Sequence, residues 1–323
     1  MKTAVAWIGI AAAALAALAA SAGAAPDAAD IHWAFPANPS PAPAGGWDHV
    51  RRIRLYGRSP GYTEAQIRDR SHAVDWRPGS HPPLPAIVAD GHPPDVDACG
   101  FCHLPAGEGR PENAALAGLS RDYIVSQVRA FASGARRSEA PGWGPSGFMS
   151  DLARRTSPQD AAAAADYFSR LKFTSRVRVV EAASTPRPTA SNFLLVPAKG
   201  QPAEPLGARI VEAPASMARF EHRDSLLTYT AFVPVGSLTR GAALAGGADG
   251  TQPCAACHGA GLKGGSIGPP LAGRSPTYLF RQLHAFQAGA RSGAEADPMR
   301  SVTARMSAPD MIALAAYAGS LKP

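Results

Sequence analysis

Cysteine is scarce in this chain of 323 residues, and all of it lies in two short motifs. The four cysteines belong to residues 99–103, Cys-Gly-Phe-Cys-His, and to residues 254–258, Cys-Ala-Ala-Cys-His. No thiol is left for a separate disulfide framework, and no cysteine between residues 25 and 98 could carry a lipid anchor. The two motifs must therefore account for all the cysteine chemistry of the chain.

Long apolar runs are also absent beyond the first 25 residues. The chain opens with Met-Lys-Thr, continues with an Ala/Leu-rich run over residues 4–20, and passes through small residues to Ala25. This order is typical of a secretory signal peptide. We expect residues 1–24 to be a cleaved signal peptide and the mature protein to be periplasmic. If the signal stayed uncleaved, it would anchor the chain in the membrane, since the run borders on spanning length.

Basic residues are numerous but form no cluster. The formal net charge is +7, yet Lys and Arg are spread along the chain and no nucleic-acid-binding motif is present. We therefore expect no nucleic-acid partner. A moderate positive charge suits an acidic protein partner or an anionic membrane surface, so membrane-surface association stays open.

The spacing within each motif suits covalent attachment of a haem. Two thiols three residues apart lie on one helical turn, where both can form thioether bonds to haem vinyl groups, and the adjacent histidine can bind the iron. A four-cysteine zinc site would leave both histidines unexplained, and a thioredoxin-like pair would need a strand leading into each motif. We expect two covalently bound haem c groups. The attaching residues are Cys99, Cys102 and His103 in the first motif and Cys254, Cys257 and His258 in the second.

The sequence around the first motif recurs around the second. At an offset of 155 residues a turn, a helix pattern and its glycine stop are repeated. The matched pairs include Tyr123 and Tyr278, Gln127 and Gln282, Phe131 and Phe286, Gly134 and Gly289, and Arg136 and Arg291. Towards the end of each copy the offset becomes 150, which places Met149 opposite Met299. We expect these methionines to be the sixth ligands of the two irons.

Two residues compete with Met299 for the second iron. Met306 is a methionine nearby, but it aligns with Thr156, which could not be the equivalent ligand in the first copy. His284 could also bind iron, although it aligns with Arg129 on a helix surface. We therefore predict Met299 and keep Met306 and His284 as alternatives.

Together these features resemble the dihaem class I cytochromes of the c4 type. The likeness rests on the attachment motif, a Leu-Ala-Gly turn, a Tyr-x-x-x-Gln-x-x-x-Phe helix, the ligand methionine and a final helix ending in Leu-Lys. It covers residues 95–172 and 241–323. The resemblance implies helical haem domains that carry electrons. It also implies that a carbonyl before the turn orients each proximal histidine, at Pro270 in the second copy and at Ala115 in the first.

The remaining segments depart from that family. Residues 25–94 are rich in Pro and Trp and lack a helical period, so we expect an irregular arm that packs on a domain through its tryptophans. We expect His81 and His92 of this arm to be solvated loop residues. Residues 176–240 hold short apolar runs separated by Pro and Gly, typical of strands.

The predicted fold is therefore mainly α. Two cytochrome c-type helical haem domains, residues 95–175 and 241–323, are expected to be joined by a small strand-containing insert.

Paired methionine and histidine ligands would leave no open position on either iron, which favours one-electron transfer over substrate chemistry. We expect an electron carrier rather than an enzyme, acting alone or as the cytochrome subunit of a respiratory dehydrogenase or oxidase assembly. Its partners would be redox proteins such as a dehydrogenase or terminal oxidase. The alternative is a dihaem enzyme such as a cytochrome c peroxidase, which would need one iron to lose its methionine.

Overall fold

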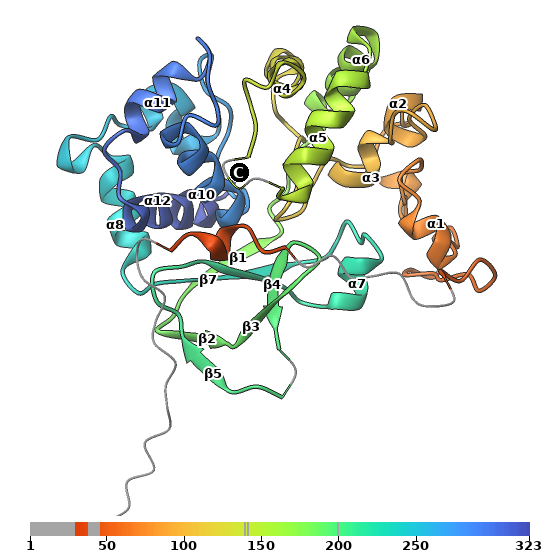
Figure 1. The fold of residues 1–323 in the computed structure, drawn as a ribbon, viewed down its shortest axis with the longest axis horizontal. Helices are drawn as coiled ribbons and strands as arrows, with labels where there is room; N and C mark the ends of the chain where they lie inside the picture. Colours follow the sequence, from red (N-terminus) through yellow and green to blue (C-terminus); the bar gives the residue numbers. More distant parts are fainter. Residues whose placement is uncertain (1–29, 38–45, 139, 141, 199) are drawn as a thin grey trace, which may run out of the picture.

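The computed structural model describes residues 30–37, 46–138, 140, 142–198 and 200–323. The predicted signal peptide, residues 1–24, lies outside this part of the chain. Two groups of helices stand above a small sheet, and the N-terminal arm lies beside the first group (Figure 1). The predicted mainly α fold with a strand-containing insert is confirmed. In the described part of the chain, none of the helices has the length and apolar character needed to span a bilayer.

The first helical group is the first copy of the repeat. Its helices are α3 (Cys99–His103), α4 (Arg121–Ser133), α5 (Gly144–Arg155) and α6 (Pro158–Ser169). The spacing of Ile124, Val128 and Phe131 at i, i+4 and i+7 predicts an apolar stripe on α4. Ile124 shares a buried core with Ala165 and Phe168 of α6, so α4 packs onto the terminal helix of this group.

The second helical group repeats the arrangement. Its helices are α8 (Ser237–Ala245), α9 (Ala255–His258), α10 (Pro276–Gln287), α11 (Asp297–Thr303) and α12 (Ala308–Ser320), with short 3-10 turns η3 (Ala248–Gly250) and η4 (Ala260–Leu262). Leu279 and Phe280 of α10 share a core with Met311 and Ile312 of α12. The first helix of this group begins four residues before the expected boundary at Gly241.

Both terminal helices start at a serine that is followed three residues later by an aspartate, a sequence pattern that predicts a helix start. The hydroxyl of Ser157 accepts the backbone N–H of Asp160 at 3.1 Å, and that of Ser307 accepts the N–H of Asp310 at 3.2 Å. Each bond satisfies one of the N–H groups that a helix start leaves without a partner. Gly134 ends α4 in a left-handed conformation with φ of 77°, which explains the glycine at the predicted stop.

The insert forms three small sheets and one short helix. Its strands are β1 (Val177–Glu181), β2 (Ser184–Pro186), β3 (Pro188–Ser191), β4 (Leu194–Pro197), β5 (Ala203–Pro205), β6 (Val211–Pro214) and β7 (Tyr229–Val233), and its helix is α7 (Met217–Glu221). In the main sheet β7 lies between β1, which is parallel to it, and β6, which is antiparallel. The pairs β2–β5 and β3–β4 are antiparallel.

The main sheet packs into the hydrophobic core of the second haem domain. Ala231 and Val233 of β7 are completely buried in the same core as Phe280. The carboxylate of Glu212 in β6 accepts the Ser275 hydroxyl at 2.7 Å and the backbone N–H of Thr277 at 3.0 Å, which caps the start of α10. The insert is therefore a structural support and not a flexible linker.

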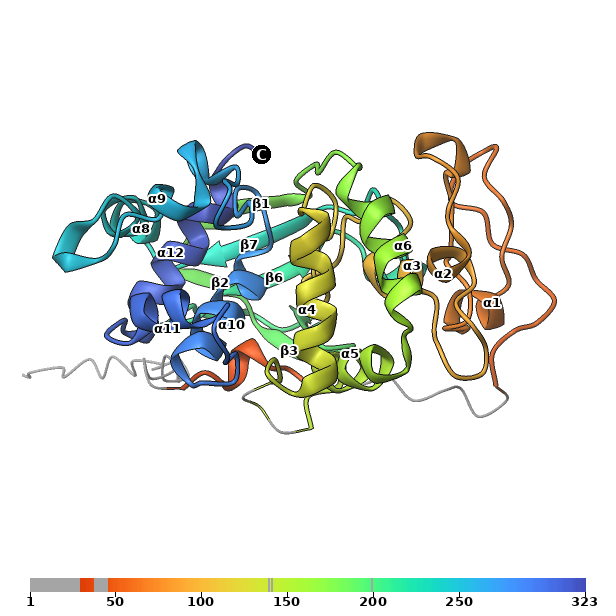
Figure 2. The ribbon, with the colours of Figure 1, turned by 90° about the horizontal axis from the view of Figure 1, so that it is seen from above.

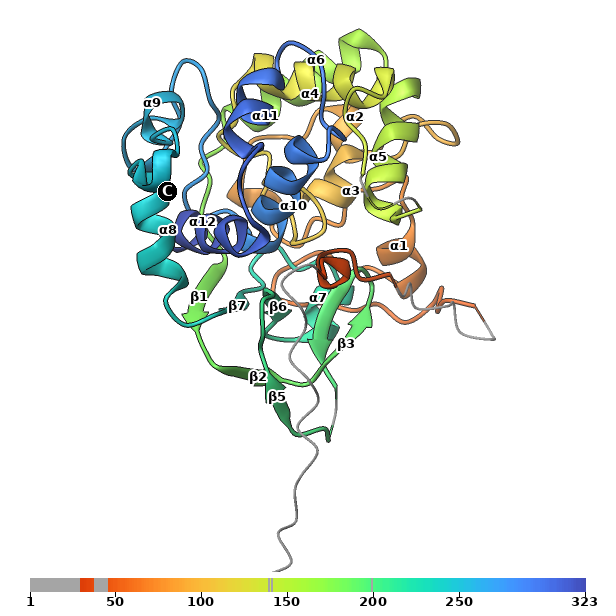
Figure 3. The same ribbon diagram turned by 60° about the vertical axis from the view of Figure 1, so that its left-hand side comes forward.

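The arm contains short elements and packs in two directions. Its elements are η1 (His32–Ala34), α1 (Glu64–Arg68), η2 (Pro78–Ser80) and α2 (Ala86–Ala89). The ring centroid of Trp33 in η1 lies 4.6 Å from that of Phe280, in the core of the second haem domain. Figure 3 shows η1 between α10 and the strands of the insert. Trp76, in contrast, donates its ring N–H to the carbonyl of His222 beside α7.

His81 and His92 of the arm differ in their surroundings. The prediction of a solvated His81 is wrong, because its side chain is 4% exposed and its Nε2 lies 3.1 Å from the Asp75 carboxylate. Folding of the arm onto α6 causes this burial, since Tyr167 of α6 contacts the His81 ring. His92 is exposed and lies 3.1 Å from Asp160, as a loop histidine was expected to be.

Candidate haem sites

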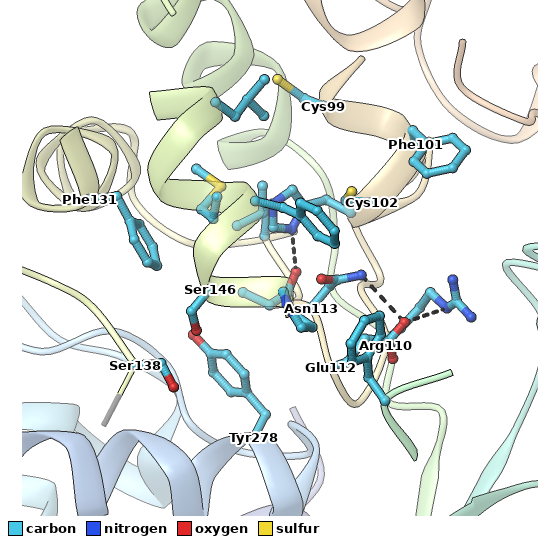
Figure 4. Close-up of a pocket in the computed structure, with 18 of the residues that line it drawn as sticks. Cys99, Phe101, Cys102, Arg110, Glu112, Asn113, Phe131, Ser138, Ser146 and Tyr278 are labelled. Carbon is cyan, nitrogen blue, oxygen red and sulfur yellow. Dashed lines mark hydrogen bonds and ion pairs between the residues drawn. The ribbon is translucent and has the colours of Figure 1, made fainter. Parts of the chain in front are cut away.

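The first attachment motif occupies a single turn of helix. In α3 both Cys99 and Cys102 face a cavity of about 350 Å³, which His103 also lines. Gly100 is needed between them because a Cβ at this position would lie 2.7 Å from the carbonyl oxygen of Val88 in α2. Figure 4 shows the two thiols on α3, with Phe131 of α4 and Tyr278 of α10 pointing toward the same space.

His103 is held in the orientation that a proximal ligand requires. Its Nδ1 lies 2.8 Å from the carbonyl oxygen of Ala114. Donation of the Nδ1 proton to this carbonyl leaves Nε2 with its lone pair directed away. Burial lowers the pKa of His103, which further favours the neutral, metal-binding form. The acceptor is one residue earlier than predicted, because the tight turn brings Ala114 and not Ala115 over the ring.

Met149 lies on α5 and lines the same cavity as Cys99, Cys102 and His103. Its helix starts at Gly144, where a Cβ would lie 2.7 Å from the ring of Phe193 in the insert. The insert therefore packs closely against the start of the helix that carries Met149. The ligand role of Met149 stays a prediction, and its position is consistent with it.

The walls of the first cavity come from every part of the chain. Sequence reasoning identified only α3, α4 and α5, since these carry the repeat. The structure adds Arg68 and Arg70 from the arm, Phe193, Phe220 and Arg223 from the insert, and Tyr278, Arg281 and Gln282 from the second haem domain. The arm and the insert have no counterpart in the repeat, and the repeat does not indicate that residues of the second copy line the cavity of the first, so no sequence pattern pointed to these walls.

The second motif repeats the histidine geometry. The Nδ1 of His258 at the end of α9 lies 2.8 Å from the carbonyl oxygen of Pro269. The predicted acceptor, Pro270, is again one residue too late. Gly268 is required next to it, because a Cβ there would lie 2.8 Å from Nδ1 of His258. Burial lowers the pKa of His258 as it does that of His103.

The three candidate ligands of the second iron lie in different surroundings. Met299 is half-buried on α11. Met306 packs in an apolar cluster with Leu283 and Tyr317, and Cys254 borders the same cluster. His284 stacks on the ring of Phe280 with centroids 6.1 Å apart. Since Met306 and His284 already serve packing, Met299 remains the predicted ligand.

The donor sets fit covalently attached haem better than the alternatives. Each motif offers two thiols and one oriented imidazole on a single turn, α3 and α9. Neither helix is preceded by a strand, unlike the redox pairs of thioredoxin-like proteins. Among the described residues no three His, Cys, Asp or Glu side chains are grouped to hold a metal ion, so a four-cysteine zinc site does not form.

The two haem domains are joined by an arginine clasp, which consists of the hydrogen bonds that Arg136 and Arg291 each make to the opposite domain. Arg136 donates to Gln282 at 2.8 Å and to Tyr278 at 3.0 Å, while Arg291 donates to Gln127 at 2.7 Å and to Tyr123 at 3.4 Å. Burial alone would raise the pKa of Tyr123, but the charges of Arg291 and Arg136 outweigh it and lower the pKa. The arginine that follows the helix-ending glycine in each copy therefore donates hydrogen bonds to the matched tyrosine and glutamine of the other copy.

Comparison with known proteins agrees with these sites. The family model described as cytochrome c matches residues 239–322. Cytochrome c-554(548) of Halomonas halodenitrificans is 38% identical over 77 residues, which cover 93% of that protein and 24% of this chain. The chain belongs to the cytochrome c family. The resemblance to dihaem class I cytochromes is thereby confirmed, and this cytochrome carries the matching attachment motif twice.

A second relative matches a longer stretch of this cytochrome. A thiosulfate dehydrogenase electron acceptor of Thiomonas intermedia is 28% identical over 218 residues, which cover 66% of this chain and 74% of that protein.

Two solved structures also match this cytochrome. They are thiosulfate dehydrogenase TsdBA of Marichromatium purpuratum (28% identity, TM-score 0.47) and reduced cytochrome c4 of Pseudomonas stutzeri (22% identity, TM-score 0.43). The matches cover 72% and 69% of this chain. The chain spans 38% of the TsdBA chain and 93% of the c4 chain.

Proposed function

We propose that this cytochrome is a periplasmic one-electron carrier with a haem c on each motif, acting as the electron-accepting subunit of a dehydrogenase. The proposal rests on the geometry shared by the two motifs. In each motif the histidine Nδ1 lies 2.8 Å from a backbone carbonyl oxygen, which orients the ring as a haem ligand requires. Haem bound in this way supplies reversible one-electron chemistry at iron.

The chain itself contributes fixed geometry to that chemistry. The carbonyls of Ala114 and Pro269 hold the two imidazoles, so that neither ring must turn when the charge at the site changes. The apolar residues Ile124, Leu119 and Leu152 line part of the first cavity. A site of fixed geometry needs little reorganisation during electron transfer.

The two attachment helices differ in their access to partners. In α3 the residues between the cysteines, Gly100 and Phe101, are buried beneath α2 and the insert. In α9 the matching residues, Ala255 and Ala256, are exposed. We therefore place exchange with protein partners at the α9 side, and we assign the covered α3 site to internal transfer.

The partner class follows from the relatives. The match to a thiosulfate dehydrogenase electron acceptor covers 66% of this chain, so we propose a dehydrogenase of that kind as electron donor. Export to the periplasm rests on the signal-like residues 1–24 and on the attachment motifs.

Optical redox titration of the exported holoprotein tests this function. We expect two haem c per chain, a methionine-to-ferric-iron charge-transfer band from each, and no turnover of peroxide. Replacing Met299 should abolish one band, while the matched variant Met306→Leu should keep it, because Met306 packs in the core. A high-spin iron in the resting protein, or peroxide turnover, would contradict the carrier.

A further inference from the structure

Arg223 is the one arginine of the insert that reaches the attachment helix of the first haem. It follows α7, and its φ of 56° is unusual for a residue other than glycine. Its Nη1 donates to the carbonyl of Phe101 at 2.9 Å and its Nε to the carbonyl of Ile67 at 3.2 Å. The guanidinium carbon lies 3.3 Å from the centroid of the Phe101 ring. This side chain therefore covers the segment between Cys99 and Cys102.

Among the described residues, no carboxylate forms an ion pair with Arg223. Three carboxylates line the same cavity, and each already faces another arginine: Asp97 faces Arg70, Glu112 faces Arg110, and Glu221 faces Arg68. Burial lowers the pKa of Arg223 to about 9, so the guanidinium stays charged at neutral pH.

At the second motif, no arginine of the described residues covers the segment between the two cysteines. The residue that matches Phe101 is Ala256, and it is exposed rather than covered by an arginine. The repeat therefore supplies a natural comparison, with the same histidine bond at both sites and a half-buried arginine against the attachment helix at only the first of them.

We propose that Arg223 raises the reduction potential of the haem on α3. A fixed cation disfavours the ferric state, which carries one positive charge more than the ferrous state, and this effect is strong where water is excluded. The inference rests on the proposed function, since it requires a haem at each motif. It gives the insert an electronic role, in which electrons entering at the α9 site are held at the α3 site.

Redox titration of the holoprotein with Arg223→Met tests the proposal. We expect one potential to fall by at least the equivalent of a tenfold change in the ferric-to-ferrous ratio, about 59 mV, while the other stays in place. Arg223→Lys should keep most of the potential because it keeps the charge. The exposed insert residue Arg178 is the matched control, and Arg178→Met should move neither potential. Adding Met149→His identifies the α3 site, because loss of methionine ligation lowers the potential of the haem concerned.

The outcomes separate this proposal from the function on which it rests. Two unchanged potentials in a fully haem-loaded Arg223→Met protein, or an equal fall in both, would overturn the role of Arg223 and leave the carrier intact. Absence of haem c from the exported wild-type protein would instead contradict the function. If Arg223→Met does not fold, Arg223→Gln removes the charge while keeping a donor for the Phe101 carbonyl.

Discussion

Single side chains at helix ends bind the two copies to their neighbours. Asp160 is an example, since it receives the Ser157 hydroxyl at 2.6 Å and lies 3.1 Å from Nε2 of His92 in the arm. It thus joins the start of α6 to the arm. The hydrogen bond from Ser157, followed by that from His92, lowers the pKa of Asp160 below its usual value of 3.8.

This pKa shift predicts how the stability depends on pH. Because the folded state favours the carboxylate, its contribution is present above pH 3.8 and is lost as pH falls through the lower pKa of the folded state. We expect Asp160→Asn to lower the free energy of unfolding by about 1 kcal/mol at pH 7, because the carboxylate that accepts the Ser157 hydroxyl and faces His92 is lost. Urea denaturation across pH 2–7 measures the difference, which should shrink towards the acid end. The control is Asp95→Asn, an exposed position; a gap that persists at pH 2 would exclude the carboxylate as its source.

At the scale of elements, the crossing of α8 and α12 sets the core of the second haem domain. The helices approach so closely at Gly241 that a Cβ there would lie 2.1 Å from the carbonyl oxygen of Ala313. No flexible side chain is available to move aside, because the contact is with backbone. A glycine is therefore required at this crossing even though it lowers helix propensity.

Gly241→Ala should consequently destabilise the protein although alanine is the better helix former. Forcing the helices apart costs about 1–3 kcal/mol, which exceeds the gain of under about 1 kcal/mol from propensity. Gly246→Ala, at the end of the same helix, is the control, because its Cβ would be 3.4 Å from the nearest atoms. Thermal unfolding compares the two variants. Equal melting temperatures would show that the crossing is looser than described.

Most elements of the haem domains could be predicted from the sequence, whereas their neighbours could not. The repeat located both attachment turns, and Ser157 and Ser307 marked helix starts correctly, because these features depend on local chemistry. The acceptors of His103 and His258 were placed one residue late, since the path of a tight turn depends on backbone dihedrals that residue types alone do not define.

Contacts between distant segments escaped sequence reasoning for a different reason. Tyr123 and Gln127 match Tyr278 and Gln282, but a repeat cannot tell whether such residues face their own domain or the other. The arm and insert have no repeat and no regular period. Their contribution to the first cavity, such as that of Arg223, therefore became visible only in the fold.

At the scale of the whole molecule, the arginine clasp and the insert make two haem domains into one body. Seen from above, α4 of the first domain stands between α5 and α10 (Figure 2). Arg136 and Arg291 are both largely buried at this junction, and their backbones form an isolated β-bridge. Leaving the buried guanidinium groups or their partners without a hydrogen bond would raise the free energy of the folded state.

Removal of one half of the clasp should therefore loosen the junction. We expect Arg136→Met to lower the free energy of unfolding by about 1–3 kcal/mol, because Gln282 and Tyr278 lose a charged partner. Arg137→Met, at the exposed neighbouring residue, should have little effect. Denaturation followed at both haems measures the change, and a more separated pair of transitions is expected for Arg136→Met only. Identical curves for the two variants would argue against a stabilising clasp.

The parallel pairing of β1 with β7 gives the two helical groups a rigid connection. The chain crosses from the first haem domain along β1, returns through the rest of the insert, and crosses again along β7, with Val177 opposite Tyr229 and Glu181 opposite Val233. Each crossing is a five-residue strand, roughly 16 Å long. Hydrogen bonds between β1 and β7 hold the two strands in a fixed register. The rate of electron hopping inside the molecule should accordingly be insensitive to solvent viscosity, since no domain motion has to bring the centres together.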